Sequence, residues 1–300
     1  KESLYFGKAF LCLIFLFLEI RKIKLENKQI ILDFIMPMFE RTDLMIGVDK
    51  LSRLKASHVL VVGLGGVGAY AAEMLCRAGI GKLTLVDSDK VSESNKNRQL
   101  LALDSTQGMF KTDVLYQRLK DINKDVELVC LNEYLKDERM LDVLKETKYD
   151  YVIDAIDTLS PKLYLIAHCV KLSIPVVSSM GSGGKLNPSL VQIADISQSY
   201  NCPLARMIRK HLHKFGIYEG VQVVFSSEEV SKDTVREERS ENKRTNVGTI
   251  SYMPAIFGCF AASVVIRDLI GELPKEKLKD TRYYHNKKTK ISDIIGVNVV

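Results

Sequence analysis

The sequence predicts an α/β fold with a doubly wound, mostly parallel sheet, followed by an α+β extension towards the C-terminus. Three observations predict it. A β-branched run over 58–62 leads directly into a glycine-rich turn. A helical pattern over about 66–78 and an apolar run over 82–86 follow that turn. Further short apolar runs then alternate with helical patterns, which is typical of parallel sheets covered by helices on both faces.

Composition sets broad limits on the class of protein. The chain has 300 residues, 46% of them hydrophobic, which suffices for one large α/β domain or a domain with an appendage. Its formal charge of +6 permits a polyanionic partner without requiring one. Six cysteines are scattered without a C-x-x-C pair, which argues against a zinc site or a disulfide framework. We therefore expect a cytoplasmic protein.

The first 37 residues differ from the rest. The run 9–20 is strongly apolar, but a membrane span needs about 20 such residues, and no small-residue cleavage site follows it. We expect 1–37 to lie outside the fold, with a native start at Met36 or Met38. The competing interpretation is a weak membrane-surface anchor, and we expect no stable membrane insertion. The remaining boundaries are predicted as a nucleotide domain over 38–180, a continuous substrate and dimerisation part over 181–270, and a tail over 271–300 without an assigned role.

The glycine-rich turn predicts a nucleotide site. Gly63 allows a tight turn, Gly65 and Gly66 let a phosphate approach the bare backbone, and Gly68 lets the next helix pack close to the strand. The N-terminus of that helix offers N–H groups to an anion. Asp87 follows the second strand, where a carboxylate can accept hydrogen bonds from a ribose. The alternative is a turn with a purely structural role.

Cations after the second strand favour ATP over a nicotinamide cofactor. Asp89, Asn95, Arg98 and Gln99 follow that strand, and Lys111 lies near the start of a helix predicted over 106–119. A helix N-terminus largely satisfies a pyrophosphate, whereas the β- and γ-phosphates of ATP need cations. Arg98 and Lys111 can clamp a triphosphate. An NAD-dependent oxidoreductase remains an alternative, but it leaves both cations without a role, as does the view that they are plain surface charges.

Two further groups are candidates for catalysis. A strand predicted over 151–157 contains two acids. Asp157, at or beyond its tip, is the better candidate for Mg²⁺ held with ATP, whereas Asp154 is expected to accept backbone hydrogen bonds. Arg41 precedes the nucleotide domain. It is either a surface charge or, in a symmetric dimer, an arginine finger that reaches the partner's phosphates.

The second half offers weaker signals. Cys202 precedes a helix that Pro203 opens, and a helix N-terminus activates a thiol, but we favour a non-catalytic role for it. The charged stretch 226–246 is expected to be a mobile loop, and 253–270 a buried or dimer-facing helix. The helix from Pro203 carries cations that either contact solvent or bind RNA phosphates: Arg206, Arg209, Lys210, His211, His213 and Lys214.

Taken in order, these motifs resemble a known family. The motifs are Gly63-x-Gly65-Gly66-x-Gly68, Asp87-x-Asp89, Asn95-x-x-Arg98-Gln99, Lys111 and the IDAID of 153–157. They resemble the ubiquitin-activating-enzyme-like ATP-binding fold, a Rossmann-like group that includes the ThiF and MoeB adenylating enzymes. Within it the chain is most similar to the tRNA threonylcarbamoyladenosine dehydratases. That finer likeness spans about 39–269 and depends on the segments 39–42, 152–157, 178–183, 202–205 and 248–254.

The resemblance implies an ATP-dependent enzyme that adenylates the threonyl carboxylate of threonylcarbamoyladenosine in tRNA and closes it into a ring. It implies that Gly66 and Asp87 contact the nucleoside or phosphates. It also implies that Asn95, Arg98 and Lys111 hold the triphosphate. Asp157 would serve Mg²⁺, and Arg41 would be the finger of a homodimer, with a cysteine desulfurase as a possible further partner. The alternative within the group is an adenylating enzyme for a ubiquitin-like sulfur carrier. Such enzymes often carry two C-x-x-C pairs, which this chain lacks.

Overall fold

A computed structural model of the chain describes residues 37–237 and 245–272. The chain divides into two compact units, Lys1–Leu51 and Ser52–Val300. The predicted boundaries at 37, 180 and 270 remain predictions. The predicted extension and tail lie outside the described residues, apart from Pro37 and residues 271–272. In the first unit the described chain forms a 3₁₀ turn, Pro37–Phe39, and the helix α2, Glu40–Ile46.

The described elements alternate as the sequence predicts. The helices are α2, then α3 (Val48–Ala56), α4 (Gly68–Ala78), α5 (Lys111–Ile122), α6 (Asp137–Glu146), α7 (Leu159–Lys171), α8 (Pro203–Lys214) and α9 (Tyr252–Leu269). The strands are β1 (His58–Val62), β2 (Lys82–Val86), β3 (Glu127–Leu131), β4 (Tyr151–Asp154), β5 (Val176–Ser179), β6 (Val191–Asp195), β7 (Gln222–Ser226), β8 (Val235–Glu237) and β9 (Thr245–Val247).

Seven of these strands form one sheet in the order β3-β2-β1-β4-β5-β7-β6. Its neighbours are parallel except for β6, which runs antiparallel to β7 at the edge. The chain moves outwards from β1 to β3 and then returns to β4 on the other side of β1. This reversal is the point at which open α/β sheets bind ligands, outside the carboxyl ends of the strands.

The register brings the expected site residues together at the carboxyl ends of the central strands. Val62 at the end of β1 is paired with Val86 of β2 on one side and with Asp154 of β4 on the other. Asp154 is in turn paired with Ser178 of β5. The residues that follow these strands, Gly63 among them, must therefore emerge side by side.

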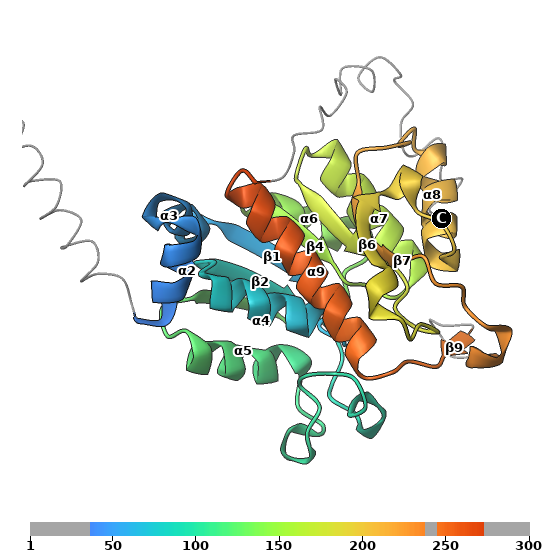
Figure 1. The fold of residues 1–300 in the computed structure, drawn as a ribbon, viewed down its shortest axis with the longest axis horizontal. Coiled ribbons are helices and arrows are strands. Elements are labelled where there is room, and N and C mark those ends of the chain that lie inside the picture. The colour runs from blue at the N-terminus through green and yellow to red at the C-terminus, as the bar shows by residue number, and fades with distance from the viewer. Residues whose placement is uncertain (1–36, 238–244, 273–300) are drawn as a thin grey trace, which may run out of the picture. The chain divides into compact units, whose positions relative to one another are not determined.

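Helices cover both faces of the sheet. In Figure 1, α4 and α9 lie side by side across one face, with α5 beside α4, while α6 and α7 lie behind the sheet. The central parallel strands are buried on both faces, β1 and β4 along their whole length, whereas the edge strand β3 is partly exposed. This explains why they appear in the sequence as continuous apolar runs instead of alternating ones.

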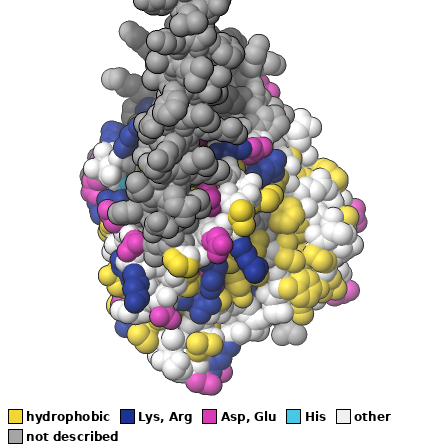
Figure 2. Space-filling model, turned by 60° about the vertical axis from the view of Figure 1, so that its left-hand side comes forward, with side chains coloured by type: hydrophobic (Ala, Val, Ile, Leu, Met, Phe, Trp, Pro, Cys, Tyr) yellow, Lys and Arg dark blue, Asp and Glu magenta, His cyan; other side chains and the backbone are white. Residues whose placement is uncertain are grey.

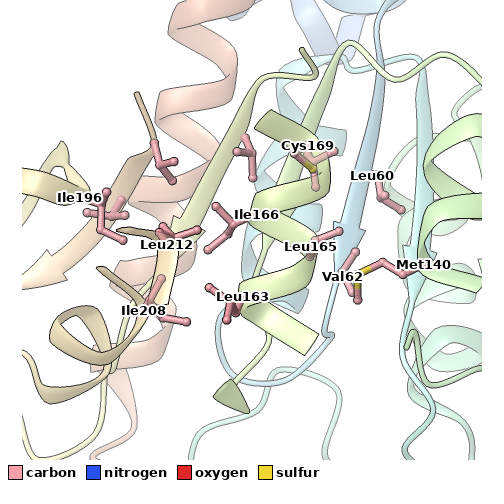
Figure 3. Close-up of a cluster of buried hydrophobic side chains, with 14 of the residues drawn as sticks. Leu60, Val62, Met140, Leu163, Leu165, Ile166, Cys169, Ile196, Ile208 and Leu212 are labelled. Carbon is pink, nitrogen blue, oxygen red and sulfur yellow. The ribbon is translucent and has the colours of Figure 1, made fainter. Parts of the chain in front are cut away.

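A hydrophobic core lies on the α7 face of the sheet (Figure 3). Leu60 and Val62 of β1 point towards Leu165 of α7 and Met140 of α6. The same core continues to α8 through Leu212 and its neighbours. These buried side chains set the distance between α7 and the sheet. They therefore also position the loop that joins β4 to α7.

The structure corrects three expected boundaries. The helix predicted over 106–119 begins only at Lys111, because Gly108 has a φ of +82° and interrupts it. The strand predicted over 151–157 ends at Asp154, so Asp157 lies in the following loop. The stretch 226–246, expected to be a loop, contains β8 and continues into β9, which pair as an antiparallel ribbon.

One helix in the described ranges, α9, is long and apolar enough to be a candidate membrane span. It packs against α4 and against strands β4, β5 and β7, with Phe257 and Ala261 fully buried. A core helix explains its composition equally well.

On the surface drawn in Figure 2, hydrophobic side chains gather in one patch with lysine and arginine side chains beside it.

Candidate active site

A cavity of about 1450 Å³ opens at the carboxyl ends of the central strands. Its walls come from the ends of β1, β2 and β5, from the loops that follow these strands and β4, and from the start of α8. All of its lining residues belong to the second compact unit. Of the predicted site residues, those that line it are Gly63, Gly65, Gly66, Asp87, Asp89, Asn95, Arg98, Gln99, Lys111 and Asp157.

The glycine turn has the close packing that the sequence predicts. Gly63 has a φ of +88°, and its N–H donates to the carbonyl of Val86 at 2.8 Å. A Cβ on Gly63 would lie 2.7 Å from the carbonyl oxygen of Ala155. A Cβ on Gly68 would lie 1.7 Å from the carbonyl oxygen of Gly63, so only glycine allows α4 to start against the turn. Gly68 thus packs the helix, while Gly65 and Gly66 face the cavity.

Asp87 and Lys111 form a charged group beside this turn. Asp87 accepts hydrogen bonds from the backbone N–H of Leu64 at 2.6 Å and of Asp89 at 2.8 Å. Burial raises the pKa of Asp87 above its ordinary value, and the nearby charge of Lys111 opposes that rise. Lys111 Nζ lies 2.8 Å from Asp89 Oδ2 and 3.8 Å from Asp87 Oδ2. A buried cation therefore lies at the cavity wall, where an anionic ligand would meet it.

The second predicted cation, Arg98, follows a short 3₁₀ turn, Glu93–Asn95. Asn95 caps this turn by accepting the N–H of Ser92 at 3.1 Å. Arg98 donates from one guanidinium nitrogen to the carbonyl of Ser94 at 2.8 Å and to Asn97 Oδ1 at 2.9 Å. The guanidinium is thus held by neutral oxygens, so its charge is available to phosphate oxygens.

The loop after β4 separates the two predicted acids. Asp157 is exposed and lines the cavity, whereas Asp154 is fully buried. Asp154 accepts the backbone N–H of Ile156, as predicted, at 3.1 Å. It also forms an ion pair with Lys162 at 2.8 Å, with both side chains fully buried. The sequence analysis missed Lys162, because a lysine in the first turn of a helix normally indicates exposure.

The donor set at Asp157 suits a metal that arrives with a nucleotide. In the described ranges no group of three or more His, Cys, Asp or Glu side chains is arranged to hold a metal ion. Mg²⁺ is commonly bound by one or two carboxylates together with substrate phosphates and water. A single carboxylate beside a phosphate-binding turn fits that arrangement.

A second buried lysine of the cavity lining, after Lys111, is Lys185. Lys185 donates to the backbone carbonyls of Asn201, Ser226 and Glu228. Burial lowers its pKa from the ordinary value. Cys202, at the start of α8, is buried and lines the cavity close by. No signal in the sequence indicates that this lysine is buried.

One segment spans both ends of the cavity. The N–H of Gly184 donates to the carbonyl of Gly248 at 2.8 Å. Next along the chain, the carbonyl of Thr249 accepts from Asn97 Nδ2 at 3.0 Å. A Cβ on Gly183 would lie 3.0 Å from Val247 Cγ1, so the end of β9 rests directly on the glycine-rich loop 181–184.

Arg41 lies on α2 in the first compact unit and is exposed. Its predicted role as an arginine finger remains a prediction.

Comparisons with known proteins agree with this geometry. The model of the ThiF family matches residues 40–295. The tRNA threonylcarbamoyladenosine dehydratase of Bacillus subtilis (strain 168) is 39% identical over 250 residues, which cover 81% of this chain and 98% of that protein. The crystal structure of E. coli tRNA N6-threonylcarbamoyladenosine dehydratase in complex with ATP matches with a TM-score of 0.71 at 33% identity. It covers 78% of this chain and 94% of that one.

The AMP complex of the same E. coli protein matches with a TM-score of 0.70 at 33% identity, covering 77% of this chain and 93% of that one. The matched length includes β1, the glycine turn and both predicted cations, and the similar solved structures hold a nucleotide. By its motifs, its sheet order and these matches, the chain belongs to the ThiF family.

Proposed function

We propose that this chain is an ATP-dependent tRNA threonylcarbamoyladenosine dehydratase. The observation that carries the proposal is the cavity, in which a glycine turn and two cations share one wall while a second end remains for another substrate. Its volume of about 1450 Å³ exceeds the roughly 300–1,000 Å³ of an ordinary small-molecule site. Similarity to dehydratases over nearly their whole length supports the same substrate class.

The geometry supports the nucleotide contacts that we propose. The backbone of Gly65 and Gly66 approaches the phosphates, and Asp87 accepts hydrogen bonds from the ribose. Lys111 and Arg98 bind triphosphate oxygens, with Asn95 and Gln99 completing the wall. Lys111 would exchange a carboxylate partner for a phosphate, so that its charge is never left unpaired in the buried site.

Asp157 would hold Mg²⁺ together with the phosphates of ATP. When bound, Mg²⁺ neutralises charge on the phosphates and polarises the reacting phosphoryl group. Arg98 and Lys111 would add to this by stabilising the charge that develops in the transition state.

The first proposed step makes a poor electrophile reactive. A threonyl carboxylate oxygen attacks the α-phosphorus of ATP, the bond to the bridging oxygen of the β-phosphate breaks, and pyrophosphate leaves. The product is an acyl adenylate. A free carboxylate would have to expel oxide, whereas the acyl adenylate expels AMP.

The second step closes the ring. The neighbouring carbamoyl group attacks the activated acyl carbon, the bond from that carbon to the AMP oxygen breaks, and a proton is released. The modified base has then lost one water, while ATP has become AMP and pyrophosphate. Because both reacting groups belong to one nucleoside, the enzyme contributes chiefly by positioning them.

The proposal includes partners and place. We propose a homodimer in which Arg41 of one protomer completes the site of the other, acting on modified tRNA in the cytoplasm. A cysteine desulfurase is proposed as a further partner.

The deciding experiment is incubation with ATP, Mg²⁺ and tRNA that carries threonylcarbamoyladenosine, followed by mass spectrometry of the nucleosides. We expect a loss of water from the modified base, and the variants Arg98→Ala and Asp157→Ala should abolish it while remaining folded. An unchanged nucleoside would refute the proposal. Pyrophosphate exchange stimulated by a carrier protein ending in Gly-Gly would instead indicate sulfur-carrier activation, and binding of NADH would indicate an oxidoreductase.

A further inference from the structure

A fully buried ion pair lies behind the cavity wall. Lys162, in the first turn of α7, pairs at 2.8 Å with Asp154, the last residue of β4. Neither side chain has any exposed surface. Removing two charges from water is costly, and apolar residues of similar volume often serve stability equally well. The pair therefore calls for an explanation other than stability.

Both partners of the pair hold the backbone of the same residue, Ile156. Asp154 Oδ1 accepts the N–H of Ile156 at 3.1 Å, and Lys162 Nζ donates to the carbonyl of Ile156 at 3.0 Å. Ser178 Oγ donates to Asp154 Oδ2 at 2.6 Å, which fixes the carboxylate from the neighbouring strand. The Ile156 backbone is thus clamped at both its donor and its acceptor.

The loop that contains Ile156 contacts the phosphate end of the cavity at two points. Ala155 lies against the glycine turn, since a Cβ on Gly63 would come within 2.7 Å of its carbonyl oxygen. Asp157 follows Ile156 directly and lines the cavity. A shift of the Ile156 backbone would therefore move Asp157 relative to the phosphate-binding backbone. Misplacement by about 1 Å in a reacting site can reduce the rate about 10²-fold.

We propose that Lys162 is a positioning residue that holds Asp157 at the phosphate end of the cavity through the backbone of Ile156. This inference rests on the proposed role of Asp157 towards Mg²⁺ and ATP. Lys162 itself touches neither nucleotide nor tRNA. Its ammonium group is required because it serves two acceptors at once, the carboxylate of Asp154 and the carbonyl of Ile156.

The test separates positioning from simple stability. Lys162→Met alone leaves a buried carboxylate without its cation and is expected to unfold readily. The double variant Asp154→Asn/Lys162→Met is neutral and keeps the volume, so it should fold, but it removes the donor to Ile156. The matched control is Glu73→Gln/Arg118→Met. It neutralises the ion pair between α4 and α5, whose residues do not line the cavity.

Three measurements are made on the full chain. Hydrogen exchange without ligand should be faster for the amides of 155–158 in the Asp154/Lys162 double variant and unchanged in the control. The gain in ATP affinity on adding Mg²⁺ should shrink to that of Asp157→Asn. The turnover rate on modified tRNA should fall about 10²-fold, whereas the KM for tRNA should remain near its wild-type value.

Each outcome decides a separate question. A double variant with wild-type exchange, Mg²⁺ response and turnover would overturn the positioning role while leaving the proposed function intact. Wild-type protein that leaves modified tRNA unchanged would end the proposed function, and the Mg²⁺ response and hydrogen exchange would still decide on Lys162. If Mg²⁺ does not raise the ATP affinity of the wild-type protein, Asp157 does not bind Mg²⁺ with ATP and the inference fails.

Discussion

At the scale of single residues, Lys111 is the buried cation whose charge both the fold and the proposed ligand would use. Its side chain is 5% exposed and that of Asp87 9% exposed, so their interaction is weakly screened by solvent. Without a nucleotide, Lys111 opposes the rise that burial causes in the pKa of Asp87. The same cation can turn to a phosphate, so its removal should affect both stability and binding.

Lys111→Met should show a pH-dependent loss of stability. Without the cation, the pKa of Asp87 rises further above its unfolded value. The charged carboxylate then destabilises the fold at neutral pH, and this penalty fades as the pH falls through the folded-state pKa. We expect a loss of about 3 kcal/mol at pH 7 and a smaller loss at pH 5, measured by urea unfolding. ATP affinity should fall about 10- to 100-fold.

The double variant Lys111→Met/Asp87→Asn serves as the control, because it also removes the buried charge and should recover stability at pH 7. Equal losses at both pH values for Lys111→Met would show that Asp87 does not depend on this lysine.

Two glycines of one turn should respond differently to a methyl group. In Gly68→Ala the new Cβ would meet the backbone oxygen of Gly63, so we expect a loss of about 3 kcal/mol in the free energy of unfolding. In Gly65→Ala the nearest atom is Gln99 Nε2 at 3.8 Å, so stability should change by less than about 0.5 kcal/mol. ATP affinity should still fall about tenfold, because the methyl group projects into the cavity. Unfolding curves and ATP titrations check the pair, and equal stability of the two variants would contradict it.

At the scale of elements, α9 sets the position of the nucleotide helix α4. Gly258 lies where the two helices cross, and a Cβ there would lie 2.4 Å from the carbonyl oxygen of Val67 and 2.9 Å from Tyr70 Cβ. Val67 immediately precedes α4 and lines the cavity. The close approach of α9 therefore reaches the backbone that faces the phosphates.

Gly258→Ala should push α9 away from α4. We expect a loss of about 1–3 kcal/mol in stability and weaker ATP binding, measured by thermal unfolding with and without ATP. Ser263→Ala on the same helix is the control. Ser263 donates only to Phe260 of its own helix among the described contacts, so a change within about 0.5 kcal/mol is expected. A tolerated Gly258→Ala would show that the helices can separate without cost.

The sequence predicted the elements whose signal is local. The glycine turn, the strands around it and the helix opened by Pro203 have residue types that their backbone geometry demands. Contacts between distant segments escaped prediction. Nothing near Lys162 in the sequence points to Asp154, and periodicity places a lysine at the surface. The antiparallel direction of the edge strand β6 was equally hidden, because strand direction depends on pairing partners and not on the strand's own residues.

At the scale of the whole molecule, α8 leads from the cavity to the surface. Its first residues line the cavity, and Arg206, Lys210, His213 and Lys214 are exposed along it. Its buried side is fixed, since Arg209 donates to the carbonyl of Ser199 at 2.7 Å and Leu212 lies in the core. A tRNA whose modified base enters the cavity would thus meet a row of cations.

Arg206→Glu/Lys210→Glu should weaken binding of tRNA but not of ATP. Since each phosphate contact releases counterions, the slope of log affinity against log salt should become shallower by about 1–2. Filter binding at several salt concentrations measures it. The control is Lys124→Glu/Lys148→Glu, because both exposed lysines precede the amino ends of strands, β3 and β4, whereas the cavity lies at the carboxyl ends. Equal slopes for the two variants would exclude α8 from the RNA-binding surface.

The segment that joins Gly184 to Asn97 has a consequence for how the ligands bind. Gly248 and Thr249 are consecutive residues, and their carbonyls accept hydrogen bonds from Gly184 and Asn97, which belong to different walls of the cavity. A ligand that moves one half of the cavity would move the other half through this segment. The resulting coupling free energy between the two ligands is the same in both directions at equilibrium. Nucleotide and RNA would then each change the other's affinity by the same factor.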